Sequence, residues 1–72
     1  MDLLLERADG RVVGLEVKAS ASIQAKDFKG LQSLADRLGP AFHRGVVLYT
    51  GTEVLPFGPG LWALPVSGLW AP

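Results

Sequence analysis

The chain has 72 residues, of which 49% are hydrophobic and 19% are charged. This length allows a single domain, and this balance excludes disorder for most of the chain. Cysteine is absent and histidine occurs once, at His43, which excludes a disulfide framework, a thiolate zinc site and a histidine-rich metal centre. Seven basic and seven acidic residues cancel, which argues against a general polyanion binder that relies on many phosphate contacts.

The first part of the chain predicts a β-hairpin. Strands are expected over residues 3–7 and 11–19, with a turn between them that ends at Gly10. Along the second strand one alternate set of residues is wholly apolar, and we expect this set to face the core. The set comprises Val13, Leu15, Val17 and Ala19.

The length of the turn fixes the register of this hairpin. A two-residue loop would send Asp2 to the core face of the sheet. A three-residue loop over residues 8–10 instead places Leu3 opposite Leu15 and Asp2 opposite Glu16. We predict the three-residue loop because it keeps the apolar side chains of both strands on one face.

The middle of the chain predicts one amphipathic helix. Residues 25–38 carry apolar side chains at spacings of three and four. Asp27 in the first turn suits the positive end of the helix dipole, and Gly39-Pro40 ends the helix. We expect the apolar stripe of this helix to pack on the apolar face of the second strand. The stripe consists of Phe28, Leu31, Leu34, Ala35 and Leu38.

A nearly continuous apolar run over residues 45–50 predicts a buried third strand, with His43 at the surface in the loop before it. Strand, helix and strand in this order predict a right-handed parallel crossover. Two short strands are expected over residues 53–57 and 61–65 as a C-terminal β-hairpin. The expected fold class is therefore α/β, a minimal β-β-α-β core with a C-terminal hairpin, in a single domain over residues 1–72.

Asp2, Glu16 and Lys18 form the candidate chemical site. Glu16 and Lys18 are two residues apart on one strand and share a face, and the predicted register places Asp2 across from Glu16. Two close carboxylates repel each other, and a Mg²⁺ ion between them removes this penalty because it prefers oxygen ligands. Such a metal would polarise a phosphodiester, and Lys18 would stabilise the developing negative charge. The predicted metal contacts are Asp2, Glu16 and Val17.

Five segments of the chain carry a family resemblance. They cover residues 2–6, 14–20, 26–31, 45–51 and 61–70, which is essentially the whole chain. The strand, the turn and the Glu-x-Lys strand followed by a helix resemble the PD-(D/E)XK fold, the fold of restriction-endonuclease-like enzymes. The order of the segments is similar to DUF4143, the C-terminal domain of a family of bacterial and archaeal AAA-type ATPases.

The resemblance implies that Asp2 and Glu16 bind the metal and that Lys18 assists catalysis on DNA. It also implies an upstream ATPase module as a partner, and a helix and a strand ahead of the strand that carries Asp2, so we expect a truncated domain. The helix-borne acidic residue of many nucleases has no counterpart here. Gly58-Pro59-Gly60 lacks the Lys-Ser/Thr continuation of a phosphate-binding loop, so the chain is not expected to be an ATPase by itself.

We therefore predict a nuclease-fold domain with a weak or vestigial Mg²⁺ site for phosphodiester chemistry on DNA. The alternative is a non-catalytic interaction or dimerisation module, because a short sheet leaves an unpaired edge that invites strand pairing. A homodimer is expected on this ground. The apolar runs are far shorter than a membrane span of about 20 residues, and we expect a cytoplasmic protein without a membrane segment.

Overall fold

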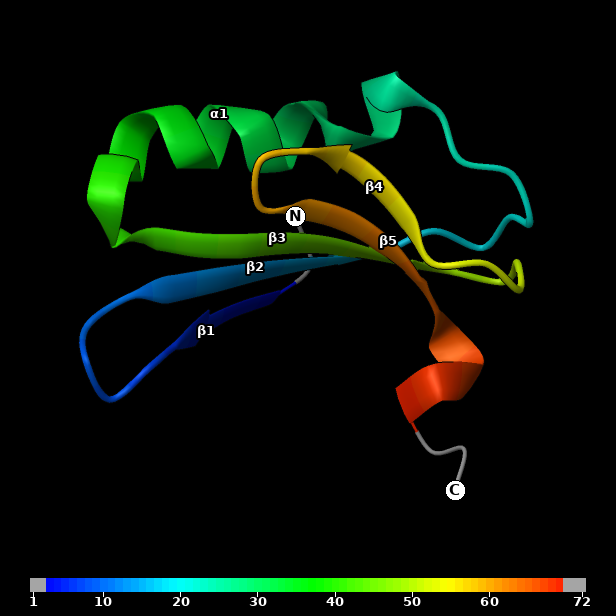
Figure 1. Ribbon diagram of the computed structural model, residues 1–72, viewed down its shortest axis with the longest axis horizontal. Helices are drawn as coiled ribbons and strands as arrows, with labels where there is room; N and C mark the ends of the chain where they lie inside the picture. The colour runs from blue at the N-terminus through cyan, green and yellow to red at the C-terminus, as the bar shows by residue number, and fades with distance from the viewer. Residues whose placement is uncertain (1–2, 70–72) are drawn as a thin grey trace.

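Five strands form one mixed sheet in the computed structural model, which describes residues 3–69 (Figure 1). The strands are β1 (Leu3–Glu6), β2 (Val12–Val17), β3 (Phe42–Tyr49), β4 (Leu55–Gly58) and β5 (Leu61–Pro65). Their order across the sheet is β1-β2-β3-β5-β4. The central strands β2, β3 and β5 run parallel, and the edge strands β1 and β4 are antiparallel to their neighbours.

One α-helix, α1 (Lys29–Leu38), crosses one face of this sheet (Figure 1). It continues directly from the 3-10 turn η1 (Ala25–Phe28) and is followed by the 3-10 turn η2 (Gly39–Ala41). A third 3-10 turn, η3 (Val66–Leu69), follows β5 on the side of the sheet away from α1. The mixed α/β architecture expected from the sequence is confirmed. None of the helices over residues 3–69 has the length and apolar character needed to cross a membrane.

The register of the first hairpin agrees with the prediction. Leu3 lies opposite Leu15 and Leu5 opposite Val13, which requires the three-residue loop. The N–H of Arg7 donates to the carbonyl of Arg11 at 2.7 Å and closes the loop. Gly10 ends the turn with a φ of 84°, a left-handed conformation that favours glycine. The predicted partner of Glu16, Asp2, lies outside the described residues.

The sheet face that α1 covers differs from the prediction. Glu16 pairs with Val47 in the parallel ladder, so the two side chains share a face, and Val47 is fully buried in the core with Leu31. The helix therefore covers the side of β2 that carries Glu16 and Lys18. The expectation that α1 packs on Val13, Leu15 and Val17 was wrong, and the side chain of Val17 is 58% exposed.

The physical reason is that the alternation of side chains along a strand assigns each residue to one of two faces, but it does not determine which face the helix covers. A parallel crossover has one strongly preferred hand, so the strand order decides on which side the connecting helix lies. The third strand offers apolar residues to both sides: Val47 and Tyr49 face α1, whereas Val46 and Leu48 face away and are also buried. A helix can dock on either side of such a strand, which leaves the hand of the crossover to decide.

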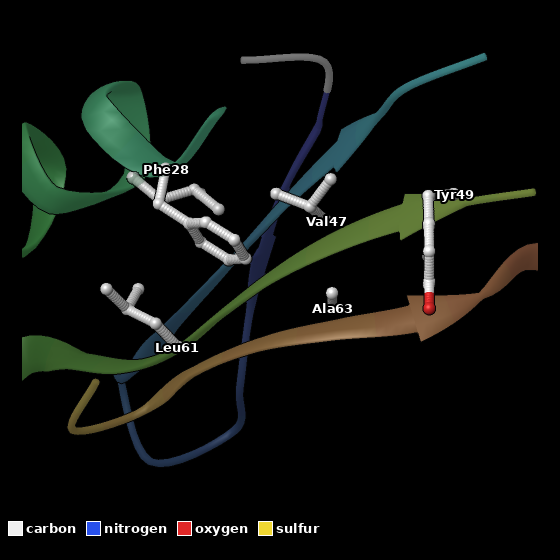
Figure 2. Packing of buried hydrophobic residues seen from close by; sticks show 6 residues of the cluster. Phe28, Val47, Tyr49, Leu61 and Ala63 are labelled. Atoms are coloured by element: carbon white, nitrogen blue, oxygen red, sulfur yellow. The ribbon is translucent and has the colours of Figure 1, made fainter. Parts of the chain in front are cut away.

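The core lies between α1, η1 and the strands β3 and β5. The ring of Phe28 extends from its helical segment toward Leu61 and Val47 (Figure 2). It also stacks on Phe57 of the edge strand β4, with ring centroids 4.6 Å apart. The core members are Phe28, Leu31, Val47, Tyr49, Leu61 and Ala63. Apolar contact dominates this core. The one polar side-chain group among these core members, the hydroxyl of Tyr49, donates to the backbone carbonyl of Glu53 at 2.7 Å.

The first testable prediction concerns Leu31, which is the most completely enclosed residue of α1, with an exposed fraction of 0%. Leu31→Ala should lower the free energy of unfolding by about 2–5 kcal/mol, because it leaves a cavity over the centre of the sheet. Urea unfolding followed by circular dichroism measures this change. The control is Ser33→Ala, an exposed position of the same helix, where we expect a change within about 0.5 kcal/mol. Equal effects of the two substitutions would mean that α1 does not pack as described.

Candidate functional site

Glu16 and Lys18, which the sequence placed in the candidate site, lie together at the carboxyl end of β2. The backbone N–H of Lys18 donates to the carbonyl of Leu48 at 2.8 Å, so the parallel ladder continues one residue beyond the strand. This bond holds Lys18 on the same face as Glu16, beneath the start of α1. Both side chains are partly buried between the sheet and the helix rather than spread on a solvated face.

The start of α1 and the end of β2 enclose a hollow of about 410 Å³. We call it the Glu16 pocket. It lies between the carboxyl end of the strand and the first turns of the helical segment, and it is lined by Glu16, Val17, Lys18, Lys26, Asp27, Gly30 and Val47. Two of the predicted site side chains, Glu16 and Lys18, therefore share one pocket. Val17 contributes to it through the main chain, because its side chain belongs to the opposite face of the sheet.

Asp27 is one of the residues lining this pocket that the sequence analysis did not assign to the site. Its Oδ2 atom accepts a bond of 2.6 Å from the Nζ of Lys18, with side chains 29% and 15% exposed for lysine and aspartate. The same oxygen accepts the backbone N–H of Gln24 at 2.8 Å. The N–H of Asp27 in turn donates to the carbonyl of Gln24 at 2.9 Å. Asp27 thus ties the tip of Lys18 to the beginning of the helical segment.

These two donors stabilise the ionised form of Asp27. The ammonium of Lys18, first, and the backbone N–H of Gln24, second, hold the pKa of this carboxyl below its ordinary value of 3.8. Asp27 is therefore charged at neutral pH and fixes Lys18 in place. The available signal in the sequence was the spacing Gln24-x-x-Asp27, in which an acidic residue three positions into a helix bonds back to the first backbone N–H.

The described part of the pocket offers a partial set of metal ligands. Among residues 3–69 there is no group of three histidine, cysteine, aspartate or glutamate side chains able to hold a metal ion. Glu16 supplies one carboxylate, Val17 can supply only its main-chain carbonyl, and Asp2 lies outside the described residues. Mg²⁺ is often held by one or two carboxylates while it keeps several waters. This donor set therefore fits a loosely held, largely hydrated Mg²⁺ ion and does not fit a tight protein cage.

Gly30 lies directly above the carboxylate of Glu16. A Cβ atom built on this glycine would stand 3.6 Å from Oε1 of Glu16, which is an ordinary van der Waals contact. Alanine therefore fits here sterically, and it would favour the helix by about 1 kcal/mol. The glycine leaves open the space beside the one described carboxylate of the candidate metal site.

His43 lies at the other end of the sheet and belongs to β3 itself, not to a loop before it. Nη1 of Arg7 donates to Nε2 of His43 at 2.7 Å, so the neutral ring carries its proton on Nδ1. That Nδ1 atom is buried without a partner among the described residues. Burial of the ring lowers the pKa of His43 below 6.5, and the guanidinium groups of Arg7, Arg11 and Arg44 lower it further.

The second prediction follows from the pKa of His43. The unfolded chain binds more protons than the folded chain between the lowered pKa and 6.5, so the free energy of unfolding decreases as the pH falls through this window. Above about pH 7 the contribution is constant. Urea unfolding between about pH 8 and pH 5 should show this loss in the wild type, and His43→Gln should remove it. Asp9 and Asp27, whose pKa values lie below 3.8, lose their contribution only at lower pH. An unchanged slope in His43→Gln would contradict the assignment.

Comparison with known proteins identifies one family. The family model described as "Domain of unknown function (DUF4143)" matches residues 1–69, nearly the whole chain. No curated protein and no solved structure matches the chain.

Proposed function

The chain belongs to the DUF4143 family, and we propose that its Glu16 pocket is a weak divalent-metal site for phosphodiester chemistry on DNA, in a domain of nuclease-like architecture. The observation that carries this proposal is the arrangement of Glu16, Lys18 and Asp27 around one solvent-accessible hollow. On one strand face Glu16 and Lys18 supply a carboxylate that can bind a divalent metal and an ammonium that can stabilise developing negative charge.

Each side chain has a separate role in this proposal. Glu16, with Asp2 and the main-chain carbonyl of Val17, would hold Mg²⁺, which when bound polarises the phosphodiester and acidifies a water molecule. Lys18 would bind a phosphate oxygen. Its ammonium has three N–H donors, one of which bonds to Asp27, so two others are available for a substrate oxygen. Asp27 is a positioning residue, because it holds the tip of Lys18 at a fixed place in the pocket.

The third prediction tests metal binding. Mn²⁺ titrated into the labelled protein should broaden the NMR signals around Glu16 and Val17 at submillimolar to millimolar concentrations, because the donor set is incomplete. Glu16→Gln should abolish this broadening. The matched control is Glu53→Gln, an exposed carboxylate in the loop before β4, which should leave it unchanged. Broadening that is the same in all three proteins would remove the basis for a metal site in the pocket.

The same proteins test catalysis. Supercoiled plasmid DNA should be nicked slowly by the wild type with Mn²⁺ and not with EDTA. Glu16→Gln and Lys18→Met should be inactive, and Glu53→Gln should retain the wild-type rate. Metal binding without nicking would mean that the site is vestigial: the ligands still bind a metal, but the protein does not cleave DNA.

The fourth prediction concerns Gly30. Gly30→Ala should raise the free energy of unfolding by up to about 1 kcal/mol, because glycine is unfavourable inside a helix. The added methyl group stands beside Oε1 of Glu16, so it should weaken Mn²⁺ binding at the same time. Thermal unfolding and the Mn²⁺ titration measure the two effects. Stabilisation with unchanged Mn²⁺ affinity would place the metal away from the space under Gly30.

The alternative function, a non-catalytic interaction or dimerisation module, has a different observation in its favour. The edge strand β1 exposes large apolar side chains on both faces of the sheet: Leu4 is 54% and Leu5 is 47% exposed. An edge strand with exposed apolar side chains and free backbone groups is a site at which another chain can add. A module of this type would show neither the selective Mn²⁺ broadening nor the nicking described above.

A further inference from the structure

The two edges of the sheet differ in how they are protected. The edge strand β4 contains Pro56, and its register with β5 is irregular between Pro56 and Gly58. Proline and irregular pairing both prevent another strand from adding to an edge. The other edge strand, β1, begins with Leu3-Leu4-Leu5 and pairs with β2 in unbroken register. Over the described residues it has no proline, no bulge and no charge before Glu6.

The backbone groups of β1 that point away from the sheet can be assigned from the hairpin. Arg7 donates to Arg11 across the two strands, so this pair is a hydrogen-bonded one. Hydrogen-bonded and non-hydrogen-bonded pairs alternate along an antiparallel ladder. Leu5 and Leu3 therefore bond to β2, whereas Leu4 and Glu6 direct their N–H and C=O groups to the outer edge.

We propose that β1 is an assembly edge that pairs with β1 of a second copy of this chain. The pairing is antiparallel about a two-fold axis that passes beside Leu5. In this register Leu4 of each copy lies opposite Glu6 of the other, and the outward backbone groups of both residues form four hydrogen bonds. Placing Leu4 opposite Leu4 would form only two such bonds among residues 3–7, so the first register is favoured.

The side chains of the two faces support a second copy as the occupant of this edge. A two-fold axis perpendicular to the sheet keeps the same face of both copies on the same side. Leu5 then meets Leu5 on the face where it already neighbours Val13, and the apolar surface continues across the junction. Glu6 lies opposite Leu4 of the other copy, so the charge within β1 does not face a like charge. The net charge of zero adds no long-range repulsion between the copies.

This inference does not rest on the proposed metal site, and its test is carried out in EDTA. The chain contains no cysteine, so single-cysteine variants report one position at a time. Leu5→Cys should form a covalent dimer rapidly in a glutathione redox buffer. At a non-hydrogen-bonded pair the Cα atoms are about 4.5 Å apart, within the range of about 4.4–6.8 Å that a disulfide bridges.

Two matched controls separate this pairing from random collision. Leu4→Cys lies on the same strand, and Leu4 is about as exposed as Leu5. Leu4 faces the opposite side of the sheet from Leu5, and in the proposed register it lies opposite Glu6 of the second copy, so the two introduced cysteines do not face each other. Val54→Cys lies in the loop before β4 and has an exposed fraction of 57%. Both should cross-link at least about tenfold more slowly than Leu5→Cys. Equal rates for the three variants would overturn the proposal.

Sedimentation without cross-linking supplies an independent measurement. The wild type should form dimers at micromolar to submillimolar concentrations. Leu4→Pro removes one outward N–H from each copy without removing a bond to β2, and it should raise the dissociation constant by about tenfold or more. A circular dichroism spectrum like that of the wild type confirms that this variant is folded. If it is not, Leu5→Lys, which places two like charges across the axis, serves instead. A wild type that stays monomeric at submillimolar concentration would overturn the proposal.

Discussion

The close approach of α1 to the third strand at Gly45 determines the arrangement of the other parts. A Cβ atom on Gly45 would stand 2.9 Å from Cδ2 of Leu61 and 3.2 Å from Cβ of Leu31. The first distance is shorter than real Cβ contacts, and the second is tight enough that Leu31 would have to shift. The absence of a side chain at Gly45 therefore lets Leu31 pack closely on the sheet, where it is completely buried. With the helix fixed at this point, its beginning must lie over the carboxyl end of β2. The pocket is therefore a consequence of how the helix docks.

Local features of the sequence predicted the parts of the fold that local interactions determine. The register of the first hairpin followed from Gly10 and from the alternation of the two strands, which are both short-range signals. The buried members of the predicted helical stripe are Phe28, in η1, and Leu31 and Leu34, in α1. The other two predicted members, Ala35 and Leu38, are partly buried. The face of the sheet under the helix was not predicted correctly, because a non-local property, the hand of the crossover, selects it.

The same distinction holds in the candidate site. The two-residue spacing of Glu16 and Lys18 was sufficient to place both on one face. Asp27 is nine residues beyond Lys18, and the intervening connection brings it back over the strand at a place that no periodicity specifies. The consequence for chemistry is large, because a lysine on an open strand face is mobile, whereas one bonded to a largely buried carboxylate is preorganised. The position of Asp2 opposite Glu16 stays a prediction from the register.

The register of β1 with β2 connects the two proposals, because it determines which residue lies opposite Glu16. The register that sets Leu3 opposite Leu15 is the one that would carry Asp2 to Glu16. A strand paired on one side only is held by half the hydrogen bonds of a central strand. Pairing with a second copy would hold β1 from both sides and thereby stabilise its register with β2, on which the placement of Asp2 opposite Glu16 depends. If dimer formation strengthens metal binding through this register, then by linkage the metal favours the dimer by the same factor. Association measured with and without Mn²⁺ would then differ in the wild type and agree in Glu16→Gln, where the metal has lost its described carboxylate.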